Sequence, residues 1–468
     1  MQNWKFVRLF KTAVTRSPGE IDALAEIMRG YESGVNGIPA GYTYFGQFVA
    51  HDLSELQLGP PQAERLRVSE LRQARRPVLD LDSVYGGGLD DSIVRFDRKS
   101  GRFELGETAT GKRHDLPRRP DGTPLIADGR NDENLLVAQM HVLFMHFHNK
   151  LVDHYRTLPG GCRQPATELF ARARREAILT YRWITLHDFA RRLLPDAVYQ
   201  HVVRHGRGAI LDRCKRWPVT SVEFVGAALR FGHSMIQESY KISSKGQAPV
   251  KLEQLFELTG KGQLGEDRLP DDMIVDWGLF FVFLGYPGWG PTRSDRPVNQ
   301  ALQINTSITE SMRDLVRSSA QFSIIGRNLE RGEELKLASG QEICKQLQLR
   351  HPQTARDVGL REMERSRLLD DLASHPGLRD NTPLWAYVLS EAKQYVLDHD
   401  LADSKLGVLG GWLVADGLMA AAHYSDVQPD PSWRPRTSVV NRVLGGWRKD
   451  AALVDDLTLE DLIVFTYT

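Results

Sequence analysis

Cysteine is scarce in this sequence of 468 residues. Only Cys162, Cys214 and Cys344 are present, and no Cys-x-x-Cys pair occurs. Three widely separated cysteines give neither a disulfide framework nor a zinc knuckle. Zinc-protease spacing is also missing, because no His-Glu-x-x-His occurs and the histidines of residues 141–154 fall on several faces of one predicted helix.

Long apolar runs and an excess of charge of one sign are missing as well. No run approaches the roughly 20 apolar residues that span a bilayer. The opening segment is interrupted by Lys5, Arg8 and Lys11 and lacks the apolar core of a secretory signal. Sixty basic residues balance sixty acidic ones, so neither nucleic acid nor an acidic membrane is indicated as a partner. We therefore expect a cytoplasmic protein without a membrane span, and the oligomeric state stays open.

Helical periodicity is what the sequence has in abundance. Apolar side chains recur at helical spacing over residues 134–156, as in a largely buried helix. The same pattern marks 166–193, 219–240, 383–398 and 408–422. Few stretches alternate strictly, and turn residues separate the periodic runs. The sequence predicts a mainly α fold, a single domain over 1–468 with long loops and few short strands, on which residues 1–37 pack as an N-terminal extension.

The segment YTYFGQFVAHDL, residues 42–53, places Gln47 and His51 four residues apart. In a helix both side chains project from one face. Beside a cavity such a pair can bind water or peroxide, with the histidine moving protons near neutral pH. A core histidine satisfied by a backbone carbonyl is the alternative, and the motif alone does not choose between them.

Two carboxylates flank one leucine in RPVLDLDSVYGGG, residues 76–88. Asp80 and Asp82 alternate on a predicted loop, and Asp52 beside His51 can supply a third carboxylate. Carboxylates in such a pattern suit calcium. A hydrogen-bonded turn with exposed acids explains the same residues, so both interpretations stay open.

A fixed positive charge precedes the longest predicted helix. In DGRNDEN, residues 128–134, Arg130 can direct its charge into a pocket, and Glu133 lies one turn away. A simple Arg-x-x-Glu pair on a helix surface is the alternative interpretation.

A histidine also lies within the apolar run ALRFGHSMIQESY, residues 228–240. His233 follows Arg230 by three residues. A metal-bound imidazole needs a group that holds its second nitrogen, and the run itself does not identify one. A buried core histidine therefore remains an alternative.

Five segments, taken in order, resemble the animal-type haem peroxidases, and most closely their bacterial members. They are IPAGYTYFGQF, LDLDSVYGGG, LRFGH, NQALQINTS and NTPLWAYVLSEA. Each is weak alone, but together they are in register over roughly residues 38–465. The resemblance implies a large helical domain built around a buried haem.

On the distal side, the resemblance matches His51 to the distal histidine, Gln47 to the distal glutamine and Arg130 to the distal arginine. It implies a peroxidase that reduces hydrogen peroxide through an oxoferryl intermediate and oxidises a small organic donor or a halide. His51 would move the peroxide proton, and Arg130 would stabilise the charge that develops as the O–O bond breaks.

On the proximal side, His233 matches the ligand of the haem iron and Arg230 the arginine that binds a haem propionate. Asn381, in DNTPLW, matches the asparagine that holds the proximal imidazole. Such a partner keeps the imidazole oriented and electron-donating.

The haem attachment departs from the family pattern. Ala50 replaces the aspartate that forms one haem ester, while Glu133 matches the residue that forms the other. Asn134 stands where myeloperoxidase has a methionine, so no sulfonium link is expected. We expect haem b with at most one ester link, through Glu133, and a less oxidising iron.

The calcium loop departs as well. Asp52 and Asp80 match ligand positions, Asp82 falls where a serine is common, and Val78 can give its carbonyl. Arg76 stands where a threonine ligand is expected. A guanidinium there can neutralise the carboxylates and replace the ion, so calcium and arginine are both retained as hypotheses.

Other functions stay open. A biosynthetic haem oxidase or peroxygenase acting on one small molecule is compatible with Ala50 and with segment 334–338, which also departs from the family pattern. A fatty-acid dioxygenase needs a radical-carrying tyrosine three residues before the proximal histidine, where this chain has Arg230. A haemless binding protein is disfavoured by the intact set of distal and proximal residues.

Overall fold

The fold is mainly α-helical, as the sequence predicts. The computed structural model describes residues 4–12, 14–57, 68, 71–211, 218–244, 248–259, 268–283, 286, 298–314, 323–424, 427, 433–445 and 456–468. Its helices are α1 (Pro18–Arg29), α2 (Gly41–Leu53), α3 (Asp82–Tyr85), α4 (Leu135–Thr157), α5 (Ala166–Ile184), α6 (Ala190–Leu193), α7 (Asp196–Val198), α8 (Val222–Gly226), α9 (Leu252–Glu257), α10 (Glu310–Asp314), α11 (Ile324–Glu334), α12 (Gly340–Arg350), α13 (Pro352–Asp357), α14 (Arg367–Asp371), α15 (Pro376–Asp380), α16 (Leu384–Asp398), α17 (Val408–His423), α18 (Val439–Leu444) and α19 (Leu459–Tyr467).

The strands are short and pair two by two within the described ranges. The parallel pair is β1 (Lys5–Val7) with β7 (Val219–Ser221). The antiparallel pairs are β10 (Gln300–Leu302) with β2 (Val35–Pro39), β3 (Leu56–Gln57) with β4 (Arg72–Gln73), β5 (Phe96–Asp97) with β6 (Arg102–Phe103), and β8 (Ser239–Tyr240) with β9 (Val250–Lys251).

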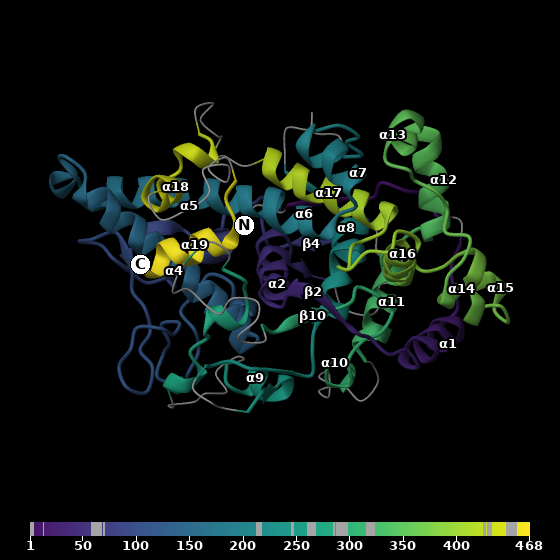
Figure 1. Cartoon of the computed structure of the whole chain (residues 1–468), viewed down its shortest axis with the longest axis horizontal. Coiled ribbons are helices and arrows are strands. Elements are labelled where there is room, and N and C mark those ends of the chain that lie inside the picture. Colours follow the sequence, from purple (N-terminus) through teal and green to yellow (C-terminus); the bar gives the residue numbers. More distant parts are fainter. Residues whose placement is uncertain are drawn as a thin grey trace.

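Helix α4 lies in the core and packs against α2, α5 and α19 (Figure 1). Its apolar residues are buried around most of its circumference, which explains why its periodicity is strong. Aromatic rings join it to α2: Phe48 stacks on Phe144, with 4.9 Å between the ring centroids. Helix α2 also contacts residues 228–235, so it lies between the longest helix and the segment that carries His233.

The predicted helices over 134–156, 383–398 and 408–422 correspond to α4, α16 and α17. The run 166–193 is helical too, although residues 185–189 take a π-helical turn between α5 and α6. None of the helices in the described ranges is both long and apolar enough to cross a membrane.

The predicted helix over 219–240 is wrong. The chain forms β7, the short α8, a 3-10 turn over Ala228–Met235 and then β8. Ala227, with φ −139° and ψ −64°, breaks the helix directly after Gly226. A side chain at Gly226 would place its Cβ 2.5 Å from Leu335, so this glycine lets the segment pack closely on the end of α11. Tertiary packing therefore overrides the helical pattern and directs the turn that carries His233.

Candidate active site

A cavity of about 270 Å³ collects most of the candidate residues. Helix α2 and the turn that precedes α4 contribute one part of its wall, and residues 229–233 contribute another. The cavity is lined by Gln47, Ala50, His51, Arg130, Glu133, Arg230 and His233, among others. These positions span nearly two hundred residues of sequence, so only the tertiary fold brings them together.

Gln47 and His51 both lie in α2 and face this cavity, as their spacing predicts. The side-chain amide of Gln47 is held at both ends. Its Nε2 donates to Glu133 at 3.1 Å, and its Oε1 accepts from Asn134 Nδ2 at 3.1 Å. Because Asn134 also caps α4 by accepting from Val137, the orientation of Gln47 is tied to the first turn of that helix.

His51 is buried, with a relative exposure of 8%. Its Nδ1 lies 2.9 Å from Asn131 Oδ1. Burial lowers the pKa of His51 to about 4, and the positive charge of Arg130 acts in the same direction. The ring is therefore neutral at pH 7 and able to accept a proton.

Arg130 is held firmly at the cavity wall. Its Nε and Nη2 bind the carboxylate of Asp128 at 3.0 and 2.6 Å, and Nη1 and Nη2 donate to the carbonyls of Ser54 and His51. Arg75 binds the same carboxylate at 2.9 Å. Burial raises the pKa of Asp128, but hydrogen bonding and charge from Arg130, with the charge of Arg75, outweigh it and lower the pKa to about 2.

His233 lies in the 3-10 turn and is held by an asparagine. Asn328 Nδ2 lies 2.9 Å from His233 Nδ1, and Asn328 Oδ1 accepts from Arg230 Nη1 at 3.3 Å. Burial lowers the pKa of His233 to about 3, and the charge of Arg230 adds to the effect. The imidazole is therefore neutral, which is the form that binds a metal ion.

The expected partner of His233, Asn381, is not the residue that holds it. Asn381 follows the last residue of α15, and within the described part of the chain its side chain makes one long hydrogen bond, of 3.4 Å, to the carbonyl of Gly377. Its backbone carbonyl accepts from Arg16 at 2.8 Å, which fixes this stretch against the N-terminal segment. The side chain thus serves the end of α15 and does not contact the imidazole.

Sequence reasoning missed both asparagines that bind the two histidines. Asn328 has a signal that could have found it, because it lies between Ile325 and Leu329 on the buried face of the amphipathic helix α11. A polar residue at a core position of a helix requires a partner. Asn131 has no such signal, since it lies in a turn where asparagine is common.

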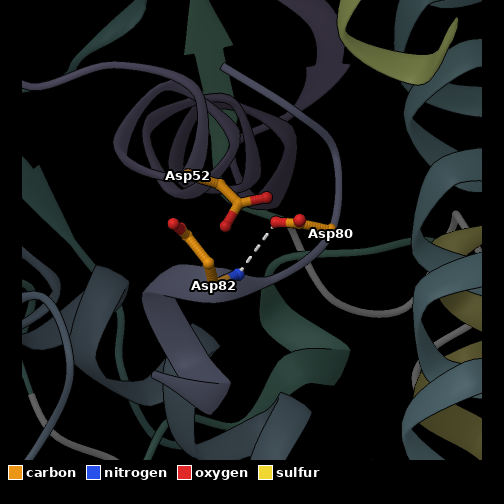
Figure 2. A group of neighbouring side chains, drawn as sticks. All are labelled: Asp52, Asp80 and Asp82. Atoms are coloured by element: carbon orange, nitrogen blue, oxygen red, sulfur yellow. Dashed lines mark hydrogen bonds between the residues drawn. The ribbon is translucent and has the colours of Figure 1, made fainter. Parts of the chain in front are cut away.

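Three carboxylates meet beside the cavity (Figure 2). Asp52 projects from α2, and Asp80 and Asp82 come from the chain that enters α3. One oxygen of each lies within 4.8 Å of the others. Leu81, between them, has a φ of 57°, a left-handed conformation that side chains rarely adopt and that turns both aspartates toward Asp52.

Two of the three carboxylates are paired with arginine side chains of the same chain. Arg76 Nη1 pairs with Asp80 at 3.2 Å, and Arg75 Nη1 lies 3.5 Å from Asp82. Burial and the neighbouring carboxylates raise the pKa of Asp82 to about 7. Burial likewise raises the pKa of Asp52 well above its usual value.

Several of the other oxygens are engaged as well, although the buried Oδ1 of Asp82 has no hydrogen-bond partner among the described residues. Asp52 accepts hydrogen bonds from the backbone of Leu81 and from both the backbone and the hydroxyl of Ser83. The carbonyl of Val78 accepts from the amide of Asp80 at 3.0 Å. Calcium needs six to eight free oxygen ligands. Asp52, Asp80, Asp82 and the Val78 carbonyl are fewer groups than calcium needs, and the two arginines compete with the ion for the carboxylates.

The sequence model of the animal haem peroxidase family matches residues 62–392, more than half of the chain. A peroxidasin homologue of Caenorhabditis elegans is 25% identical over 351 residues, which are 72% of this chain and 24% of that protein. Thyroid peroxidase of Canis lupus familiaris is 25% identical over 278 residues, which are 57% of this chain and 26% of that protein. The chain therefore spans about a quarter of the length of these curated relatives.

Solved structures share the fold. Peroxidase A from Dictyostelium discoideum matches 98% of this chain and 94% of that chain, with a TM-score of 0.61 and 14% identity. The fatty acid alpha-dioxygenase of Oryza sativa matches 91% of this chain and 78% of that chain, with a TM-score of 0.58 and 13% identity. At such low identities the likeness establishes the architecture and does not choose between a peroxidase and a dioxygenase reaction.

Proposed function

The chain belongs to the animal haem peroxidase family, and on that basis we propose that it binds haem b and reduces hydrogen peroxide while oxidising a small organic donor or a halide. The observation that carries this proposal is the single cavity lined by His51, Arg130 and His233. A neutral base, a fixed positive charge and a neutral imidazole are the groups that peroxide cleavage at a haem iron requires.

The wall of the cavity suits a haem on a second ground. Arg230 lies deep in the protein with its side chain partly exposed to the cavity, and burial and the charge of Arg331 lower the pKa of its guanidinium to about 10. Within the described ranges its hydrogen bonds go to Val225 and Asn328, which are both neutral. A buried cation without a carboxylate partner is complementary to the carboxylate of a haem propionate.

His233 would supply the iron ligand through Nε2, because Nδ1 is directed at Asn328. Iron binding through Nε2 requires the imidazole proton on Nδ1. Asn328 then has to present its oxygen to Nδ1, which a 180° rotation of the side-chain amide achieves without moving the helix. The rotation would set Asn328 Nδ2 against Arg230 Nη1, and both groups are donors, so Arg230 would have to give up this contact. A propionate would offer Arg230 the acceptor that replaces it, so the two events favour each other.

When bound, haem supplies the iron at which the O–O bond of peroxide is broken. His51 Nε2 would take a proton from one peroxide oxygen and return it to the other, so that the departing oxygen leaves as water. Arg130 stabilises the negative charge that develops on the departing oxygen. Gln47, held by Glu133 and Asn134, would position a water molecule or a small donor inside the cavity.

Covalent attachment is limited to one position. Ala50 lines the cavity and has no carboxylate, so it cannot form an ester. The carboxylate of Glu133 lies at the cavity wall beside Gln47, and we propose it as the one side chain able to form the link. The haem of this chain then has at most one ester.

A dioxygenase reaction is the less favoured alternative. Arg230 occupies the position three residues before His233 at which the resemblance places a radical-carrying tyrosine. A guanidinium with a buried, fully engaged Nε is not oxidised as a phenol is, so the fatty-acid oxygenase chemistry lacks its initiating group.

Spectroscopy of the purified chain reconstituted with haem tests the proposal. The expected result is a ferric Soret band that changes on addition of hydrogen peroxide. His51→Ala should slow that change by about 10²- to 10⁴-fold while haem stays bound. Acid–acetone extraction then reports the ester, because a Glu133 link retains haem on the protein. A chain that takes up no haem, or a His51→Ala variant with unchanged kinetics, contradicts the proposal.

A further inference from the structure

Behind His51 the structure holds a second buried histidine, joined to the first through one asparagine. Asn131 Oδ1 lies 2.9 Å from His51 Nδ1, and Asn131 Nδ2 lies 3.1 Å from His141 Nδ1. The three residues come from three elements: α2, the 3-10 turn Gly129–Asp132 and α4. We propose that Asn131 and His141 are positioning residues that keep the proton of His51 on Nδ1; this rests on the proposed role of His51 as the base.

The chemistry of a primary amide links the two rings. The oxygen of Asn131 can only accept and its nitrogen can only donate. In the arrangement found, His51 must therefore donate from Nδ1, and His141 must accept at Nδ1. The proton of His51 then lies away from the cavity, and the lone pair of Nε2 is left to take a proton from peroxide.

The reverse orientation of the amide would disable the base. If Asn131 turned its nitrogen to His51, the ring would have to accept at Nδ1 and carry its proton on Nε2. A neutral imidazole protonated at the cavity side cannot accept a second proton there without becoming a cation. His141 protonated at Nε2 opposes this reversal, because the lone pair of its Nδ1 would then face the oxygen of Asn131 and lose its hydrogen bond.

Burial makes the arrangement rigid. Asn131 has a relative exposure of 0% and His141 of 1%, so water does not readily replace either partner. Burial lowers the pKa of His141 to about 3, which keeps its ring neutral. The ring of Phe48 packs edge-on against His141 with 6.4 Å between the centroids, which further restricts its orientation.

The neighbouring charges act on a different property of His51. The charges of Arg130, Asp128 and Arg75 act on the pKa of His51, so they change how readily the ring gains a net charge. None of the three is hydrogen bonded to His51 Nδ1, which pairs with Asn131. The choice between the two neutral forms of His51 is thus left to the amide and to His141.

The test is a measurement of histidine tautomers that needs no cofactor. The full chain, labelled with 15N at its histidines, is examined by NMR at pH 7, with His51 and His141 assigned from the spectra of His51→Gln and His141→Gln. The expected result is a proton on Nδ1 of His51 and on Nε2 of His141. A proton on Nε2 of His51 overturns the proposal, and this outcome is independent of whether the chain binds haem.

Variants separate positioning from packing. His141→Ala should leave His51 as a mixture of both tautomers, whereas His148→Ala, which removes another buried histidine of α4, should not. Asn131→Leu should lose the preference, and Asn131→Asp should keep it, because a carboxylate still accepts from Nδ1. A His51 tautomer that is unchanged in both His141→Ala and Asn131→Leu also overturns the proposal.

Kinetics with the haem-loaded protein give the second readout. We expect Asn131→Leu to react with hydrogen peroxide about 10²-fold more slowly and Asn131→Asp to recover most of the rate. Equal loss in both variants would mean that Asn131 serves only the packing of the turn.

Discussion

Asn328 Nδ2 lies 2.9 Å from His233 Nδ1, and this single contact fixes the imidazole from a helix almost a hundred residues further along the chain. The same amide reaches Arg230 with its oxygen. His233, the proposed iron ligand, and Arg230, the proposed partner of a haem propionate, therefore share Asn328 as a hydrogen-bond partner. A substitution at Asn328 should affect both residues.

Asn328→Leu should weaken haem binding by about 10- to 100-fold, because the proximal imidazole loses the group that orients it. The matched control is Asn381→Ala, which removes an asparagine at the end of α15 without touching His233. Titration of each purified variant with haem measures the effect. If Asn381→Ala weakened binding and Asn328→Leu did not, the assignment made from the contacts would be wrong.

Asp128→Asn should slow the reaction with hydrogen peroxide about 10-fold, because Arg130 loses the carboxylate that holds its Nε and Nη2. Two arginines then remain without their shared anion, so the free energy of unfolding should fall by about 2 kcal/mol. Asp132→Asn serves as the control. It breaks the nearby pair with Arg118 but leaves Arg130 in place. Stopped-flow spectroscopy and urea unfolding of both variants check the two effects; equal peroxide rates in the two variants would contradict the first.

The free energy of unfolding of the wild type should fall as pH rises because Glu223 loses its proton, and Glu223→Gln should abolish this fall. Glu223 accepts from the amides of Leu9 and Phe10, and burial raises its pKa to about 7. A raised pKa means that the folded state holds the proton more tightly. Its contribution is present in full below the unfolded pKa and is lost as pH rises through 7. The wild type should lose up to about 3 kcal/mol from this group between pH 5 and 8.

Urea unfolding of wild type and Glu223→Gln at pH 5 and pH 8 measures this difference. The variant should become more stable relative to the wild type as pH rises. A constant difference at the two pH values would show that the carboxyl group does not titrate in this range.

Chelation of calcium should leave the wild type unaffected, because Arg75 and Arg76 already pair with Asp82 and Asp80. Arg76→Thr removes one of these charges and should make the melting temperature rise when calcium is added. Thermal unfolding with and without a chelator checks both statements. A wild-type protein whose melting temperature falls on chelation would restore calcium at this cluster.

The long helices could be predicted because the helical spacing of their apolar residues is visible in the local sequence. Helices α4 and α17 are apolar around most of their surface and form whatever their neighbours do. Residues 219–240 also have helical periodicity, but Gly226 packs closely against Leu335 at the end of α11, and that contact cannot be seen in the local sequence.

In the candidate site, too, residues placed by local helical spacing could be predicted, whereas contacts between distant segments could not. Gln47 and His51 face one cavity because a helical spacing of four puts them there. The partners of the two histidines depend on which distant turn or helix reaches them. The family resemblance of the DNTPLW segment therefore suggested Asn381, whereas in the fold Asn328 is the residue that contacts His233. Trp385, from the same segment, donates to the carbonyl of Arg230 at 3.2 Å.

The pairing of β1 with β7 has a consequence for the order of assembly. Lys5 and Val219 are neighbours in a parallel pair, and Glu223 binds the amides of Leu9 and Phe10. During synthesis, β1 cannot pair until more than two hundred further residues have been made, because its partner is β7. Helices α11 and α16 must then follow, because they supply Asn328, which contacts His233, and Trp385, which binds Arg230. Contacts of such long range form slowly. If the chain binds haem as proposed, we expect the haem to enter late, when most of the chain has been made.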